Sequence, residues 1–79
     1  QNFDNTRVKI AEEYMRDNRI CTKEVSELMC LLTFESNKLD LAKFAYQFVD
    51  DPQNYFRLYD EFTFDSSVRE LSDYIHSRS

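Results

Sequence analysis

The sequence predicts an all-α domain, a compact array of five short helices built from two and a half helix-pair repeats of about 30 residues. Three observations support this prediction: the chain has no glycine and one proline, its apolar residues recur at helical spacing, and one short pattern returns along the chain. Two-residue β-hairpin turns depend on Gly or Asn-Gly, which are missing here. A chain of 79 residues holds one modest core, so residues 1–79 are expected to form a single helical-repeat domain.

The repeat is visible in a pattern of a phenylalanine, an acidic residue and a small polar residue. Its copies stand at offsets of 31 and 30 residues: Phe3-Asp4-Asn5, Phe34-Glu35-Ser36 and Phe64-Asp65-Ser66. Seven positions after each Phe comes an aliphatic residue followed by a small one: Ile10-Ala11, Leu41-Ala42 and Leu71-Ser72. The apolar residues at 25, 28 and 32 also match those at 55, 58 and 62, at the spacing of one helical stripe, so they should face the core.

Local signals predict where the helices begin. The acidic residues of the first two copies, Asp4 and Glu35, are expected at the N-caps of the first and third helices. Thr22 is expected to cap the second helix, and Asp51-Pro52 offers the fourth an N-cap followed by proline in its first turn. Residues 37–50 carry two apolar stripes, so this helix is predicted to lie in the middle, covered on two sides.

The net charge and the short apolar runs of the chain each argue against one class of partner. A net charge of −5 makes the average surface repel phosphate groups, so nucleic acid is not expected. A helix-turn-helix around residues 33–36 is for this reason a weak alternative. The longest apolar run, residues 28–32, is far too short to span a bilayer, so no membrane insertion is expected.

No constellation of residues points to catalysis or to a cofactor. His76 is the only histidine and stands near the C-terminus, without the partners that a nucleophile and base pair needs. Cys21 and Cys30 are nine positions apart, too far for a disulfide along a helix, and with His76 they match no zinc-ligand spacing. Phosphate-binding loops and EF-hands need glycine. We therefore expect neither an enzyme nor a bound cofactor or metal.

Aromatic residues are concentrated in the predicted third and fourth helices. Most of them fit the core stripes, but Phe56 lies off the stripe and is expected to be exposed. The candidate interaction surface, for an unknown protein or peptide partner, is therefore Tyr46, Tyr55, Phe56 and Tyr59. The alternative is a small-ligand or peptide-binding pocket between the third and fourth helices, lined by the three tyrosines.

Three segments also have the pattern of a known family: Phe34 to Tyr46, Asp51-Pro52-Gln53-Asn54-Tyr55-Phe56, and Phe62 to Ser67 followed by Leu71 and Tyr74-Ile75. Through them nearly the whole chain resembles the domain of unknown function DUF4476. The resemblance implies an all-helical accessory module, common in exported or cell-envelope proteins of Bacteroidetes, with no established enzymatic activity. Because members often carry a further helical segment before the position of Phe3, it also implies a piece trimmed from a longer chain. It leaves the ligand and the oligomeric state open.

Overall fold

A computed structural model describes residues 3–78 of the chain. Its elements are α1 (Phe3–Asp17), α2 (Thr22–Cys30), α3 (Glu35–Ala45), the short 3-10 helix η1 (Tyr46–Phe48), the 3-10 helix η2 (Pro52–Glu61) and α4 (Asp65–Arg78). With η1 counted as the last turn of α3, the described part is an all-α globule of five helices, as predicted. The Cα radius of gyration of 11.6 Å is that of a compact chain of this length.

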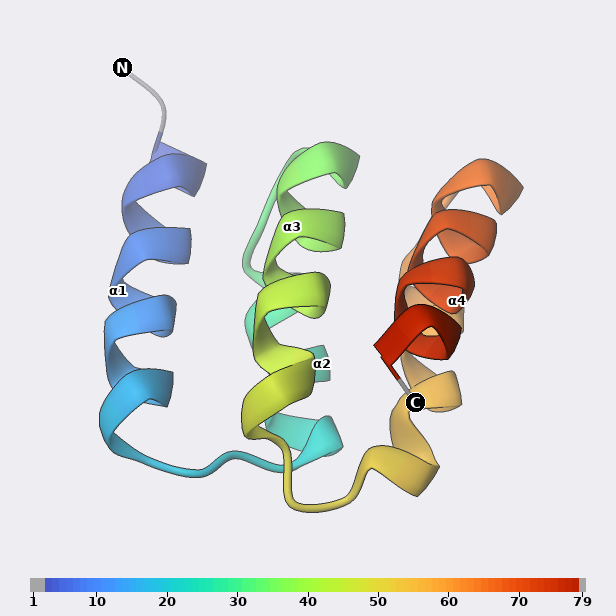
Figure 1. The fold of residues 1–79 in the computed structure, drawn as a ribbon. Coiled ribbons are helices and arrows are strands. Elements are labelled where there is room, and N and C mark those ends of the chain that lie inside the picture. Colours follow the sequence, from blue (N-terminus) through green and yellow to red (C-terminus); the bar gives the residue numbers. More distant parts are fainter. Residues whose placement is uncertain (1–2, 79) are drawn as a thin grey trace.

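The helices form two layers (Figure 1). α1, α3 and α4 stand side by side and run in the same direction, whereas α2 and η2 return behind them in the opposite direction. α3 packs against α1 on one side and against α4 on the other, and α2 packs against both α3 and η2. The central position predicted for the third helix is therefore confirmed.

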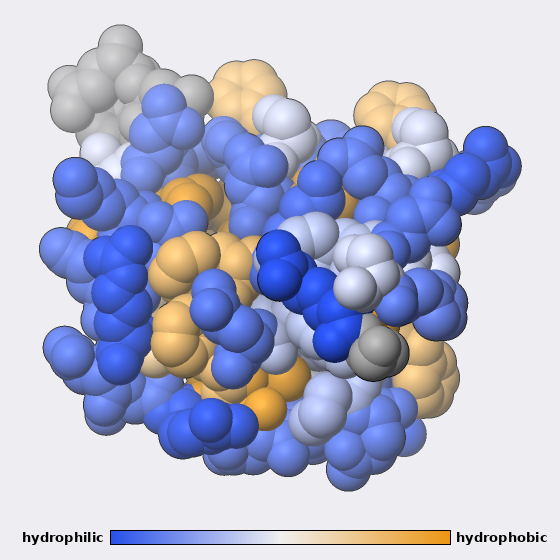
Figure 2. All heavy atoms as spheres, in the orientation of Figure 1, coloured by the Kyte–Doolittle hydropathy of each residue, from blue (hydrophilic) through white to orange (hydrophobic). Residues whose placement is uncertain are grey.

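The core collects apolar side chains from α1, α2, α3, η2 and α4. Its largest fully buried side chains are Tyr55, Met15, Ile20, Met29, Leu41, Leu58, Leu71 and Val25. The outer face of α1, α3 and α4 is mainly hydrophilic, with a hydrophobic strip along the seam between α1 and α3 and further hydrophobic side chains at the upper edge and the lower right (Figure 2). The outer helices are thus amphipathic, as a domain with one small core requires, whereas the central α3 is covered on two sides.

The third helix is shorter than predicted, because residues 37–50 do not continue as one helix. After η1, Val49 is extended and forms an isolated parallel bridge with Ile20. The Ile20 N–H donates to the Phe48 carbonyl at 3.3 Å, and the Asp50 N–H donates to the Ile20 carbonyl at 2.9 Å. Both bridge residues are buried, so their backbone groups need partners, and the bridge supplies them across two loops.

The fourth helix begins as predicted, with Asp51 at the N-cap and Pro52 in its first turn, but it is a 3-10 helix along its 10 residues. Side chains three positions apart lie on one face of a 3-10 helix. Tyr55 and Leu58 have this spacing and are only 1% and 0% exposed. The 3-10 geometry therefore directs both into the core, whereas Tyr59, which an α-helix would also place on this stripe, is partly buried.

Three of the predicted N-caps are wrong. Asp4 already lies inside α1, and Glu35 is the first residue of α3, whose N-cap is Phe34. α2 likewise includes Thr22, and its N-cap is Cys21, whose backbone N–H donates to Glu24 Oε1 at 3.0 Å. The sequence contains the right acidic and hydroxyl residues, but Glu35 and Thr22 are the first residues of their helices and Asp4 is the second residue of its helix.

The carboxylates of Asp4 and Glu35 instead bind backbone N–H groups at the start of another helix, α3 and α4 respectively. Asp4 Oδ2 accepts hydrogen bonds from both backbone N–H groups of Thr33-Phe34, at 2.7 and 2.8 Å, just before α3. Glu35 Oε2 accepts from both N–H groups of Thr63-Phe64, each at 3.0 Å, just before α4. The N–H groups at the entry to a helix have no intrahelical partner, so these side chains fix neighbouring helices to one another.

Candidate interaction groove

The four residues of the predicted surface lie in different environments. Tyr55 is a correction: it is 1% exposed, and its hydroxyl donates to the Ala42 carbonyl oxygen at 2.5 Å, so it belongs to the core and offers no side chain to a surface. Tyr46 packs edge-on against it, with ring centroids 5.1 Å apart, and Tyr59 is partly buried. Phe56 is 58% exposed, as predicted. The structure therefore leaves only Phe56 fully at the surface.

Tyr55→Phe is expected to lower the free energy of unfolding by about 1 kcal/mol, because it removes a buried hydrogen bond but keeps the ring. Burial also raises the pKa of the Tyr55 hydroxyl, so the group stays protonated and remains a donor. Urea denaturation of both proteins measures the difference. Tyr14→Phe, at a tyrosine that is 51% exposed, is the matched control and should have almost no effect; an equal loss in both variants would contradict the assignment.

Phe56 is a single exposed ring rather than part of an apolar patch. The Arg57 guanidinium lies over it, 5.7 Å from the ring centroid, and covers part of it. Isolated exposed apolar side chains are common on protein surfaces. In the alternative pocket between the third and fourth helices, the Tyr55 hydroxyl proton is already donated to backbone. The geometry thus gives this region no continuous apolar surface and no free Tyr55 donor.

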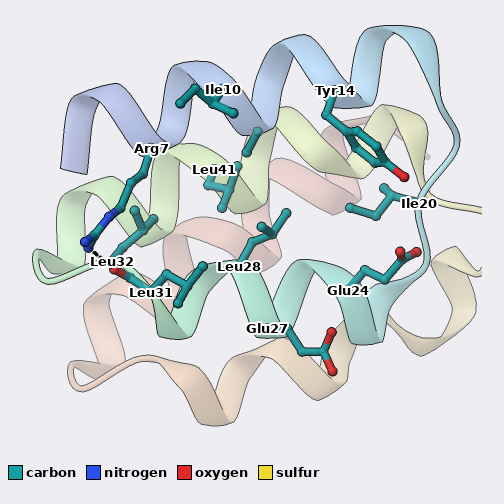
Figure 3. Close-up of a pocket in the computed structure, with 11 residues that line it drawn as sticks. Arg7, Ile10, Tyr14, Ile20, Glu24, Glu27, Leu28, Leu31, Leu32 and Leu41 are labelled. Carbon is teal, nitrogen blue, oxygen red and sulfur yellow. Dashed lines mark hydrogen bonds between the residues drawn. The ribbon is translucent and has the colours of Figure 1, made fainter. Parts of the chain in front are cut away.

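A continuous apolar surface lies elsewhere, in a groove of about 550 Å³ that opens between α1 and α2 (Figure 3). Among the large hydrophobic residues described as exposed, half line this groove, namely Ile10 at 63%, Tyr14 at 51% and Leu31 at 59%. The other lining residues are Arg7, Ala11, Ile20, Glu24, Glu27, Leu28, Leu32 and Leu41. Apolar side chains gathered in one concave place, rather than scattered, are typical of a binding site.

The groove exists because α1 and α2 pack on α3 more than on each other. The space between them is closed on the inside by Leu41 of α3, which is 1% exposed, and is open to the outside. In Figure 3, Ile10 and Tyr14 come from the α1 wall, while Leu28 and Leu31 come from the α2 wall. The two walls are helices that run in opposite directions (Figure 1).

The charge of the side chains that line the groove changes from one end to the other (Figure 3). Arg7 lies at one end, where its Nη1 donates to the Leu31 carbonyl at 2.7 Å. Glu24 and Glu27 lie along α2 towards the other end, on the side of Tyr14. The groove therefore has a basic end and an acidic end around an apolar middle.

The two cysteines and the histidine do not line the groove. Cys21 and Cys30 are free thiols, and a hydrogen bond to Glu61, together with burial, raises the pKa of Cys30. His76 is exposed near the end of α4 and bonds through Nδ1 to the Ser72 carbonyl at 2.8 Å. Within residues 3–78, no three His, Cys, Asp or Glu side chains are grouped so that they could hold a metal ion. None of the helices in that range is both long and apolar enough to cross a membrane.

The sequence did not lead to a prediction of the groove, although the apolar residues of the first helix that line it are evident in the sequence. Ile10 and Tyr14 stand beside the stripe that contains Ala11 and Met15, and the combined apolar face of this helix is wider than one contact with α3 can cover. Ala11 and Met15 are 7% and 1% exposed, while their two neighbours remain open. The excess width of the stripe is the signal that could have identified the groove.

Comparison with known proteins gives one match. The model of the family described as Domain of unknown function (DUF4476) matches residues 1–75. No curated protein and no solved structure matches the chain. The matched range includes every residue that lines the groove.

Proposed function

The chain belongs to the DUF4476 family, and from this starting point we propose that it is a non-catalytic protein-interaction module, an accessory helical domain whose α1–α2 groove accepts one α-helix of a partner protein. The observation that carries this proposal is the exposed apolar groove itself. A helix that inserts an apolar face into such a groove is a common mode of recognition.

The proposal treats the domain as two and a half helix-pair repeats: α1 with α2, α3 with η2, and α4 alone. Two features support this view. The first helices of the three units run in the same direction in one layer (Figure 1). Asp4 and Glu35, at corresponding positions, also bind the corresponding backbone pairs Thr33-Phe34 and Thr63-Phe64.

Two positions of the first helix pair, α1 with α2, are more exposed than the corresponding positions of the second pair, α3 with η2. On the repeat alignment, Ile10 corresponds to Leu41 and Leu28 to Leu58. Leu41 and Leu58 are 1% and 0% exposed, on the two helices against which α2 packs. Ile10 is 63% exposed and Leu28 lines the groove. In the second pair, the surface that corresponds to the groove is covered by α2. This correspondence argues that the groove is also occupied by a helix.

The opposite end of the array has a different character. α4 carries none of the large apolar side chains that are exposed in residues 3–78. A polar outer face is typical of the unit that caps a stacked array. The outer face of α4 therefore offers the groove of a second copy no exposed large apolar side chain, which favours a partner protein as the occupant.

Ile10→Gln combined with Leu31→Gln is expected to weaken binding of a helical probe by about tenfold or more, because two apolar contacts are lost. The probe is a hydrocarbon-stapled peptide of about four turns with leucines at i, i+3, i+4 and i+7. Fluorescence anisotropy measures its affinity, and NMR titration of the labelled domain should shift backbone amides of α1 and α2. Both replaced side chains are more than half exposed, so the variant should stay folded.

Phe56→Gln is the matched control, since Phe56 is 58% exposed but lies on η2. It should bind the probe as the unmodified domain does. Loss of binding in this variant, with full binding in the groove variant, would move the site to η2 and contradict the proposal. Sedimentation equilibrium of the domain alone tests one alternative occupant: self-association that Ile10→Gln abolishes would identify a second copy as the occupant.

A further inference from the structure

We infer that the groove selects the direction and the charge of its partner, and takes a helix that runs parallel to α2 and carries basic residues in its N-terminal half. This inference rests on the proposed function and specifies the chemistry of the partner. Two independent observations lead to it: the way in which α2 packs on the next helix pair, and the order of charges along the groove.

The packing of α2 gives the direction. α2 lies against α3 and η2, and it runs parallel to η2 and antiparallel to α3 (Figure 1). The groove between α1 and α2 corresponds to the surface of α3 and η2 that α2 covers, with α1 corresponding to α3 and α2 to η2. A partner helix that repeats this packing therefore runs parallel to α2 and antiparallel to α1. Its N-terminus then lies towards Glu24 and its C-terminus towards Leu31 (Figure 3).

The charges along the groove favour the same direction. The N-terminus of a helix carries a partial positive charge and its C-terminus a partial negative one. In the direction given above, the positive end approaches Glu24 and Glu27, and the negative end approaches the Arg7 guanidinium. Lys or Arg side chains in the first half of the partner would face the two carboxylates. The net charge of −5 adds a general attraction for a basic partner.

Three stapled peptides with one common apolar face test this inference. The first carries two lysines in its N-terminal half, the second carries them in its C-terminal half, and the third has glutamines instead. We expect the first to bind about tenfold more tightly than the second at low ionic strength, because two partly exposed ion pairs are worth about this much. Added salt should reduce the difference.

Glu24→Gln combined with Glu27→Gln should abolish the preference between the two lysine peptides. The side-chain amide oxygen introduced at position 24 can still accept the Cys21 N–H, so the start of α2 is preserved. Asp60→Asn combined with Asp73→Asn is the matched control: it makes the same change in net charge at two exposed residues that do not line the groove. The control should keep the preference.

A nitroxide label on the N-terminus of the first peptide shows the direction of the bound helix. It should broaden NMR signals around Glu24 and leave those around Leu31 sharp. Broadening around Leu31, or equal affinity of the three peptides, would overturn this inference while the groove remained a helix-binding site. If no peptide shifted the amides of α1 and α2, the proposed function itself would be wrong. The two failures are therefore distinguishable.

Discussion

Leu58→Ala is expected to lower the free energy of unfolding by about 3 kcal/mol, which is a large share of the stability of a domain of this size. Leu58 is 0% exposed and lies on η2, the helix against which α2 packs. Because the surrounding helices relax only partly around the lost atoms, the variant loses both the apolar burial and the contacts across the cavity. The melting temperature should fall by roughly 12–24 °C.

Urea denaturation followed by far-UV circular dichroism measures this loss of stability. Leu31→Ala is the matched control, since it removes the same atoms from a leucine that is 59% exposed. Its effect should stay within about 0.5 kcal/mol. Equal losses in the two variants would show that Leu58 is not packed in the core, and would contradict the described contact between α2 and η2.

Acidification is expected to destabilise the domain strongly, because three carboxylates hold backbone N–H groups at helix starts. For Asp4 and Glu35, burial by itself raises the pKa. Hydrogen bonds from Phe34 and Thr33 to Asp4, and from Phe64 and Thr63 to Glu35, outweigh this effect, so both pKa values are lowered. At Asp51, too, burial raises the pKa, but hydrogen bonds outweigh it and the pKa is lowered. One of these bonds is donated by the Thr22 N–H to Asp51 Oδ1, at 2.8 Å.

The direction of the pH effect follows from these shifts. A carboxyl group whose pKa is lower in the folded state than in the unfolded chain stabilises the fold above the unfolded pKa. The ordinary values are 3.8 for Asp and 4.5 for Glu. The contribution is therefore complete at neutral pH, begins to decline as the pH approaches these values, and is lost as the pH falls through the lower folded values. Three such groups titrating together make the effect large.

Thermal unfolding between about pH 6 and about pH 2.5 measures this contribution. Glu35→Gln should melt at a lower temperature at neutral pH, because the amide replaces a charged acceptor with a weaker one. Its melting temperature should also depend less on pH. Asp40→Asn, at an exposed residue of α3, is the control and should follow the unmodified domain. A steeper pH dependence for Glu35→Gln would contradict the assigned role of Glu35.

Features that depend on near neighbours in the chain could be predicted from the sequence. The start of the fourth helix at Asp51-Pro52 is one case, because proline suits a first turn whatever surrounds it. The central place of the third helix is another, because two apolar stripes need two covers. The roles of Asp4 and Glu35 could not be predicted, because each carboxylate binds a loop about thirty residues away.

The candidate site shows the same division. Phe56 was correctly expected at the surface, since it lies off the apolar stripe of its helix. Tyr55 was also chosen, but it is buried in the core with Leu58, as the apolar stripe that they share already indicated. The bridge between Ile20 and Val49, which ends the third helix early, joins two loops and leaves no periodic signal in either of them.

The sequence by itself determined that the chain forms helices and which face of each is apolar, because helical hydrogen bonds and the 3.6-residue period are local properties. Only the tertiary structure decided which of these faces is covered. Ile10 and Leu41 occupy the same place in the repeated pattern, yet one is 63% exposed and the other 1%. Burial depends on which helices pack against a side chain, and that is decided by the arrangement of all the helices together.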